Sequence, residues 1–376
     1  MPRPAHHVLV RNLPLCIGFC VAAAQASAQP ATDATTGQLI EAGHYLRAEK
    51  NVHAELQHAP NDPHTLIYLS VVDWAFNRLD AAIASAERAV AAAPNYAETH
   101  AHLADAVGSK LVASTAGMME RMSLAHRFRK EIDRTLELDP NNVDALQDLA
   151  QFYWHAPGIV GGDKQKARQT ADRLFQLSPF RGASARADFA GDEADPSRRN
   201  AAVQAIWRSA VAARPNDYDC RAALAAAYLE DAGDPNHLAG AEAEAQHALA
   251  LDPSRISAYN TLAVVYARTG RWDQMDTLLK QGRDRVPDDR TPEFLVANAI
   301  LSGNMGPQLQ RAEVLLRDYL AQTPEGQEPS HASAHWRLGL VLEKQGRRSD
   351  AVRELQTAIA QDGSLEAARR DLKRLS

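Results

Sequence analysis

Apolar positions recur along most of this chain with the 3.6-residue period of an α-helix. Residues 256–289 show the pattern without interruption over 34 residues. Tyr259 and Ala263 are spaced so that both lie on one face of a first helix. Gly270 suits the end of that helix, because glycine adopts positive φ without strain. A second apolar stripe begins at Met275, so the segment predicts two helices that pack as an antiparallel pair.

The same spacing recurs from one end of the chain to the other. Segments that match it well are residues 66–94, 146–179, 221–253 and 335–358. Weaker copies end in Pro60, Pro140, Pro215 and Pro324. Runs of β-branched and aromatic residues typical of strands are lacking. We predict an all-α solenoid of stacked antiparallel helix pairs, with about nine units over residues 38–363, several of them degenerate.

The unit resembles the tetratricopeptide repeat (TPR). Ala263 and Gly282 stand at its eighth and twenty-seventh positions, where small residues let two helices cross closely. The resemblance implies a right-handed superhelix whose inner wall is formed by the first helix of each unit. The chain also resembles a group of secreted bacterial TPR proteins that share no general activity, so the resemblance implies no reaction. Because the motif residues are the packing residues, they predict the fold and not the function.

The first 28 residues have the pattern of a secretory signal peptide. Arg3 and Arg11 make a basic start, an apolar run follows over residues 13–24, and Ala26-Ser27-Ala28 is a small-x-small cleavage signal. The apolar run is too short to cross a bilayer as a helix. We expect cleavage after Ala28, a flexible linker over residues 29–37, and a periplasmic or secreted mature protein.

Cleavage changes the charge and the cysteine content. The whole chain has 41 basic and 47 acidic residues, and loss of two arginines takes the net charge from −6 to −8. A mildly acidic chain without a basic run is a poor candidate for binding nucleic acid. No later segment is long and apolar enough to span a membrane. Only Cys220 remains of the three cysteines, so the mature chain has no internal disulfide.

Two regions depart from the plain repeat. Residues 108–127 form a long insertion, and the apolar pattern that continues from Met118 through Ile132 predicts an overlong second helix. Methionine-rich surfaces adapt to partners, although methionine at this spacing also suits a core. Residues 364–376 predict a C-terminal capping helix with one apolar stripe and a basic outer face.

The sequence offers little that resembles catalytic or metal-binding chemistry. His331 and His335 share a helix face, but a zinc site needs a third ligand and the HExxH pattern is absent. His100 and His102 are two apart and point in different directions on a helix. There is no Gly-x-Ser-x-Gly elbow, and Cys220 is interpreted as a half-buried free thiol. We predict a protein that is not an enzyme and that has no cofactor and no metal.

The TPR resemblance places a partner in the groove along the first helices. Its groove positions select Tyr68, Trp74, Gln147, Gln151, Trp154, His155, Asn260, Arg268, Trp336 and Arg337. Exposed aromatic and arginine side chains are typical of binding hot spots. The alternative for Trp74 and Trp154 is that they pack against adjacent helices. The family's clamp for a peptide carboxylate needs Lys and Asn at two groove positions of one unit, and no unit has both.

Two functions remain open at this level. The first is a scaffold that binds a protein or peptide partner through its concave groove, without catalysis. The second is a carbohydrate-binding accessory protein of polysaccharide export or cell-envelope assembly, in which the tryptophans are stacking platforms. The sequence identifies neither the partner nor the oligomeric state.

Overall fold

A computed structural model describes residues 34–231, 235–326 and 329–375. The predicted signal peptide and most of the predicted linker lie outside these residues. The described helices are α1 (Thr36–Ala42), α2 (Tyr45–His58), α3 (Pro63–Ala75), α4 (Leu79–Ala92), α5 (Ala97–Ala113), α6 (Met118–Leu138), α7 (Val143–His155), α8 (Lys164–Leu177), α9 (Pro179–Ala190), α10 (Pro196–Ala213), α11 (Tyr218–Glu230), α12 (Pro235–Leu251), α13 (Ile256–Arg268), α14 (Trp272–Arg285), α15 (Thr291–Ser302), α16 (Leu309–Leu320), α17 (His331–Lys344), α18 (Arg348–Gln361) and α19 (Glu366–Leu375), with short 3₁₀ turns at Gly158–Val160 and Gly306–Gln308.

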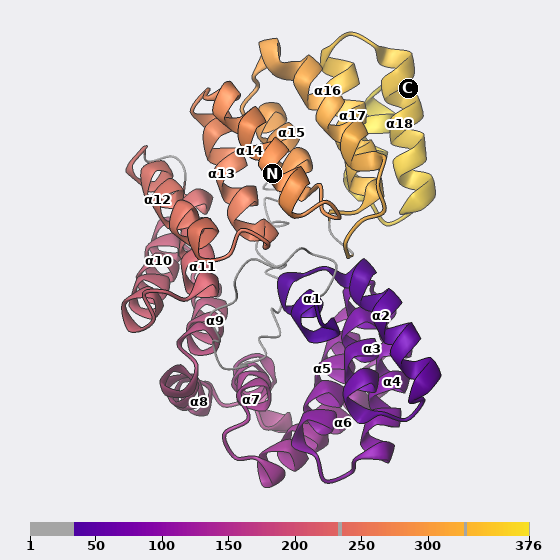
Figure 1. Cartoon of the computed structure of the whole chain (residues 1–376), viewed down its shortest axis with the longest axis vertical. Helices are drawn as coiled ribbons and strands as arrows, with labels where there is room; N and C mark the ends of the chain where they lie inside the picture. Colours follow the sequence, from indigo (N-terminus) through magenta and orange to yellow (C-terminus); the bar gives the residue numbers. More distant parts are fainter. Residues whose placement is uncertain (1–33, 232–234, 327–328, 376) are drawn as a thin grey trace.

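The described helices pack as successive antiparallel pairs, α1 with α2 through α17 with α18, followed by α19 (Figure 1). The first helix of each pair touches the first helix of the next, so α1, α3, α5 and their successors form a continuous inner layer. The predicted all-α solenoid of stacked helix pairs is therefore confirmed for the described residues. The segments over residues 182–200 and 290–310 also form helix pairs that contact their neighbours.

Local sequence signals explain where these helices begin and end. Asp62 accepts a hydrogen bond from the backbone N–H of Thr65, and Pro63 follows it at the first helical position of α3. Gly270, just after α13, has φ of 71°, the left-handed conformation that glycine adopts at no steric cost. Tight crossing follows from small residues: a Cβ on Gly282 would lie 3.4 Å from the ring of Tyr259. Repeated caps and small residues thus set the pairing along the chain.

The longest helix is α6, with 21 residues, and it pairs with α5, which has 17. The insertion is distributed over both helices, because α5 continues to Ala113 and α6 begins at Met118. The ends of these two helices expose Val112, Met118 and Met119. At the other end of the chain, α19 buries Ala368 and Leu375 against the preceding pairs. None of the described helices is long and apolar enough to cross a membrane.

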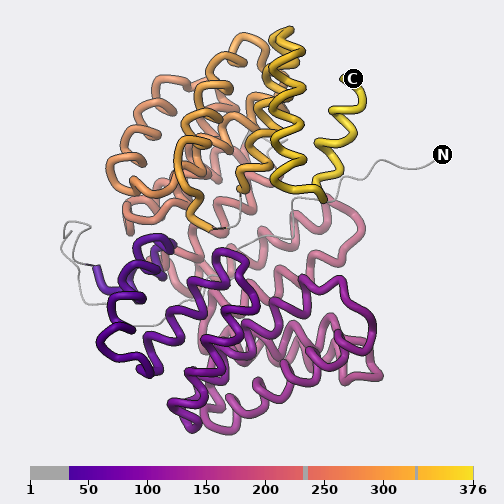
Figure 2. Tube along the Cα trace, turned by 90° about the vertical axis from the view of Figure 1, so that its right-hand side faces the viewer, coloured from indigo at the N-terminus to yellow at the C-terminus, as the bar shows by residue number. Residues whose placement is uncertain are grey.

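The superhelix curves until its first pair meets its later pairs (Figures 1 and 2). The turn between α1 and α2 carries His44, which lies 3.5 Å from Asp288 in the turn before α15. The backbone N–H of Leu46 donates to both carboxylate oxygens of Glu325, in the loop before α17, at 3.2 and 3.3 Å. The second of these contacts joins residues that are 279 positions apart in the chain. The solenoid is thus closed on itself by polar contacts.

Candidate functional site

An acidic cluster lies where three consecutive inner helices meet. Asp105 comes from α5, Asp144 and Asp148 come from α7, and Arg181 comes from α9. Asn142 caps α7 by accepting the backbone N–H of Ala145, which fixes the register of both α7 carboxylates. Because α7 contacts both α5 and α9, the four side chains converge between neighbouring units.

Asp105 and Asp148 are neighbouring carboxyls at the centre of the acidic cluster, and each affects the ionisation of the other. Burial raises the pKa of Asp105, and the charge of Asp144 raises it further. Burial and the charge of Asp105 raise the pKa of Asp148 well above its usual range. Two neighbouring carboxyls in a largely buried site resist double ionisation, which is why both pKa values are raised.

Arg181 is the cation that faces this cluster. Its side chain is 4% exposed, its Nη2 lies 2.7 Å from Asp144 Oδ1, and its Nη1 donates to Gln147 Oε1 at 3.1 Å. His102 lies 3.6 Å from Asp105, but burial lowers the pKa of His102, so the ring is neutral. Glu98 adds a fourth carboxyl, and its pKa is raised to about 7 by burial and by Asp144. The cluster therefore holds more carboxyl groups than its own cation neutralises.

The three predicted groove tryptophans bridge neighbouring units. Trp74 Nε1 donates to Ser109 at 2.9 Å, and Trp336 Nε1 donates to Asp371 at 2.9 Å. Trp154 Nε1 donates to Asp192 at 3.0 Å, and its ring stacks on Phe189 with centroids 4.3 Å apart. Trp74 and Trp154 thus contact the helix pair that follows their own, which is the packing alternative for them, and Trp336 contacts the final helix α19.

The other predicted groove residues lie on four separate helices. On α7, Gln147 is buried against Arg181, Gln151 is half-buried, and exposed His155 lies 2.7 Å from Asp188. On α3, the half-buried Tyr68 packs beneath α1, where a Cβ on Gly37 would meet its hydroxyl.

Toward the C-terminus, Arg268 of α13 donates to the carbonyl of Leu229 at 3.2 Å, and Asn260 is half-buried on the same helix. Arg337 of α17 lies over the ring of Trp336 at 3.9 Å. Only the α7 members lie together with the acidic cluster.

Sequence reasoning missed the carboxylates of this cluster. Asp144 and Asp148 stand at the second and sixth positions of their unit, which are groove positions, so the rule that selected Gln147 also selects them. They were passed over because carboxylates on helices are usually solvated. Arg181 lies in a degenerate unit, and no sequence signal pointed to it.

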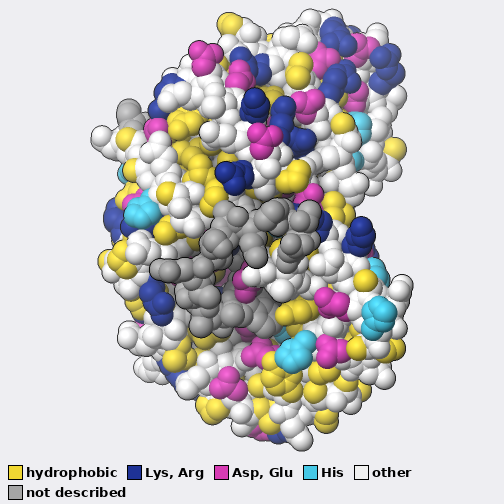
Figure 3. Space-filling model, viewed as in Figure 1, with side chains coloured by type: hydrophobic (Ala, Val, Ile, Leu, Met, Phe, Trp, Pro, Cys, Tyr) yellow, Lys and Arg dark blue, Asp and Glu magenta, His cyan; other side chains and the backbone are white. Residues whose placement is uncertain are grey.

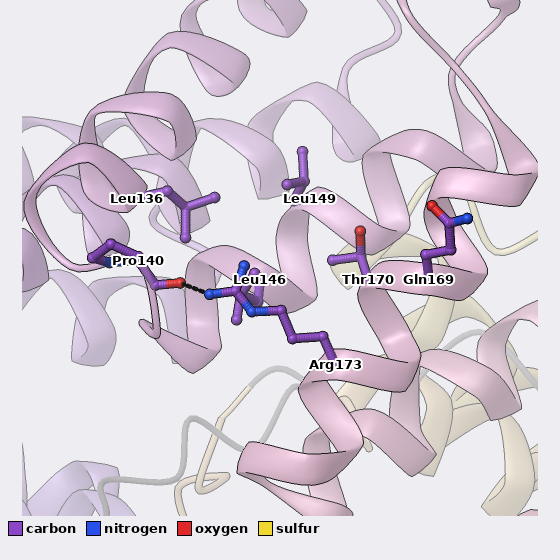
Figure 4. Close-up of a pocket in the computed structure, with 7 residues that line it drawn as sticks. All are labelled: Leu136, Pro140, Leu146, Leu149, Gln169, Thr170 and Arg173. Carbon is purple, nitrogen blue, oxygen red and sulfur yellow. Dashed lines mark hydrogen bonds between the residues drawn. The ribbon is translucent and has the colours of Figure 1, made fainter.

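A shallow pocket of about 340 Å³ lies outside the inner layer, between α6, α7 and α8 (Figure 4). Leucines 136, 146 and 149 line it, and Arg173 Nη2 donates to the carbonyl of Pro140 at 2.7 Å across its rim. None of its lining residues belongs to the acidic cluster, and the leucines are the packing residues of the repeat. The pocket carries no functional interpretation.

Comparison with known proteins gives only distant similarities. No known family profile matches the sequence, and no curated protein matches it. Among solved structures, it is similar to a thermophilic TPR protein of Thermus thermophilus, with 19% identity over 52% of this chain and 95% of that one, at a TM-score of 0.43. It is also similar to yeast Tom70, with 15% identity over 90% of this chain and 86% of that one, at 0.45. A TPR protein from Parabacteroides merdae has 12% identity over 72% of this chain and 98% of that one, at 0.46.

The fold is that of stacked TPR-type helix pairs. That assignment depends on the pairing and on the continuous inner layer described above. The identities and TM-scores are too low to bear on function.

Proposed function

We propose that this protein is a non-catalytic scaffold that binds a protein or peptide partner along its inner helices, and that the acidic cluster selects a cationic segment of that partner. The observation that carries the proposal is the charge imbalance inside the cluster. Among the described residues, Arg181 is the arginine that acts on Asp105, Asp144 and Asp148, while Glu98 beside Asp144 accepts a hydrogen bond only from the neutral Asn142.

The buried carboxyls of the acidic cluster lack enough positive charge within the fold to replace their hydration. A carboxyl whose pKa is raised by burial has lost hydration that its own protein does not replace. A lysine or arginine side chain entering the inner face supplies the missing positive charge and hydrogen-bond donors. Binding energy then comes from ionising carboxyls that the free protein holds partly protonated, so affinity should rise as the pH increases from about 6 to about 8.

The carbohydrate-binding alternative has less support. Sugar stacking needs aromatic rings that are open to the groove, whereas Trp74, Trp154 and Trp336 are buried or half-buried and each donates a hydrogen bond to a neighbouring element. The alternative is tested in the same assay with a series of neutral oligosaccharides.

Export of the mature chain is part of this proposal. Its support is the sequence pattern of residues 1–28, which lie outside the described residues. Mass spectrometry of the exported protein should show a chain that begins at Gln29.

The decisive experiment measures the binding of two peptide libraries by fluorescence anisotropy, one rich in Lys and Arg and one rich in Glu. The full mature chain should bind members of the cationic library and none of the acidic one. Asp105→Asn together with Asp148→Asn should weaken that binding about tenfold or more, since hydrogen bonds to charged groups contribute about 1.5–3 kcal/mol.

The control is Asp133→Asn, which removes an exposed carboxylate from α6 that pairs only with the half-buried Arg129, at 2.9 Å, in the described structure. It should leave peptide affinity unchanged. Equal affinity of the double variant and the native chain would refute the assignment of the cluster as the binding site. Oligosaccharide binding without peptide binding would favour the second function.

A further inference from the structure

A second cluster of side chains, all of types that bind metal ions, lies where the first helix pair meets the later ones. His44 comes from the turn between α1 and α2, Asp288 from the turn before α15, and Glu325 from the loop before α17. One nitrogen or oxygen atom from each of the three lies within 4.8 Å of the other two. Within residues 34–231, 235–326 and 329–375, no other group of three His, Cys, Asp or Glu side chains meets this condition.

His44 is the most informative member of the trio. Its residue is 4% exposed, and its Nδ1 atom has no hydrogen-bond partner. Burial, then the charge of Arg47, lowers the pKa of His44 to about 4. Nδ1 nevertheless faces Asp288 Oδ2 at 3.5 Å, which is too long for a hydrogen bond. A buried nitrogen is thus aimed at a carboxylate without a hydrogen bond between them.

We propose that His44, Asp288 and Glu325 form a site for a divalent transition-metal ion, with zinc as the best fit, which fastens the first helix pair to the later pairs. Tetrahedral zinc with bonds of about 2.0–2.1 Å holds neighbouring ligand atoms about 3.3 Å apart. The 3.5 Å between His44 Nδ1 and Asp288 Oδ2 is close to that spacing. One imidazole and two carboxylates leave the fourth position to water, as in zinc sites with three protein ligands.

Glu325 is held in place for this role. Its two oxygens accept the backbone N–H of Leu46, the neighbour of Arg47 and two residues from His44. Burial raises the pKa of Glu325 to about 8, and the charges of Asp288 and Asp289 oppose its ionisation further.

Arg47 is the competing cation, because its Nε lies 2.5 Å from Asp288 Oδ2. A carboxylate has two oxygens with about four acceptor sites, so Asp288 is able to contact Arg47 and a metal together. Arg47 holds the carboxylate by Oδ2, the same oxygen that faces His44, so it positions the ligand in the way that outer hydrogen bonds orient metal ligands.

The ligands are far apart in the sequence, which gives the ion a mechanical role. It joins a turn near the start of the chain to two turns that precede inner helices α15 and α17. Such a link restrains separation of the two ends of the superhelix, because it removes freedom from a long segment of the open state. The proposal does not depend on what the inner helices bind.

Isothermal titration with zinc chloride tests the site, on the mature full-length chain without a histidine tag and after treatment with a chelator. We expect one zinc ion per chain with micromolar or tighter affinity, and a rise in melting temperature with zinc. His44→Gln should weaken binding about tenfold or more, because it removes one of three protein ligands. Glu325→Gln, which keeps the size of the side chain, should do the same and serves if the first variant folds poorly.

The matched control is His335→Gln. His335 Nδ1 also contacts a carboxylate, Glu354, at 2.7 Å, but no third ligand joins them within the described residues. This variant should bind zinc like the native chain. X-ray absorption should show nitrogen and oxygen ligands and no sulfur. Failure of zinc to bind, or unchanged zinc affinity in both His44→Gln and Glu325→Gln, would overturn the proposal.

Discussion

The apolar core of this solenoid is continuous in the C-terminal half and divided in the N-terminal half. From Ala225 to Leu375 the inner and outer helices share one continuous apolar cluster. From Leu39 to Ala258 the apolar residues fall into six smaller clusters. The acidic cluster on α5, α7 and α9 adds buried charged groups to the N-terminal half. The surface reflects the same division, since charged side chains of both signs gather over the C-terminal end while hydrophobic ones are prominent over the N-terminal end (Figure 3).

Buried carboxylates in the two halves show why the difference matters. Burial opposes the ionisation of Glu313 in the C-terminal half. Arg347 and Arg317, each 2.9 Å from its carboxylate, outweigh that effect and lower its pKa. Asp148 in the N-terminal half has a raised pKa, because burial and Asp105 are not balanced by Arg181. A charge that is compensated within the fold serves stability. The uncompensated carboxyls of the acidic cluster are the ones that we propose meet a partner. Glu325 in the C-terminal half, whose pKa burial also raises, belongs to the proposed metal site.

The largest expected effect is on the continuous apolar cluster. Ala263→Arg puts a long charged side chain at a fully buried helix crossing and should cost about 3 kcal/mol or more of unfolding free energy. Hydrogen exchange should become faster throughout α11 to α18, because these helices share one core. Ala150→Arg, at an equally buried position in a cluster of eight residues, should affect mainly α7 to α9. If faster hydrogen exchange extended over equally many helices in both variants, the two halves would not differ in the way that their apolar clusters indicate.

An intermediate effect is expected from the acidic cluster. Asp148 has a folded-state pKa above its unfolded value, so its stabilising contribution is full below about pH 4 and is lost as the pH rises through the folded-state pKa. Asp148→Asn should therefore raise stability at about pH 8, where the native carboxyl is forced toward its charged form in a buried site. The gain should shrink at about pH 5. Chemical denaturation at both pH values measures this stability change. A loss of stability in Asp148→Asn at the higher pH would contradict the excess of buried carboxyls over cations in the acidic cluster.

The smallest effect is expected at the tip of the long hairpin. Met118 and Met119 are 75% and 81% exposed, so Met118→Ser with Met119→Ser should change the unfolding free energy by less than about 0.5 kcal/mol. Thermal unfolding followed by circular dichroism tests this. A fall of several degrees in melting temperature would mean that the two methionines pack against another surface. The N-terminal half would then hold an apolar contact beyond its six clusters.

The sequence was enough to predict the helix pairs because their determinants are local. Tyr259, Ala263 and Gly282 repeat at fixed spacing, and each pair packs mainly against its neighbours in the chain. The predicted groove residues Gln147 and Trp154 lie on the inner helix α7. What those side chains do there was left open, since the same position serves either packing or binding.

Tertiary structure alone decided the two clusters on which the proposals depend. Asp105, Asp148 and Arg181 come from three units, and the pKa values of the two carboxyls follow from burial that no single repeat encodes. His44 meets Asp288 and Glu325 only because the superhelix curves far enough for its first turn to reach its later turns. That curvature is the sum of small rotations between successive pairs, a quantity set by packing along the whole solenoid. The sequence by itself therefore determined the repeat, and the accumulated geometry of the repeats determined where its polar groups converge.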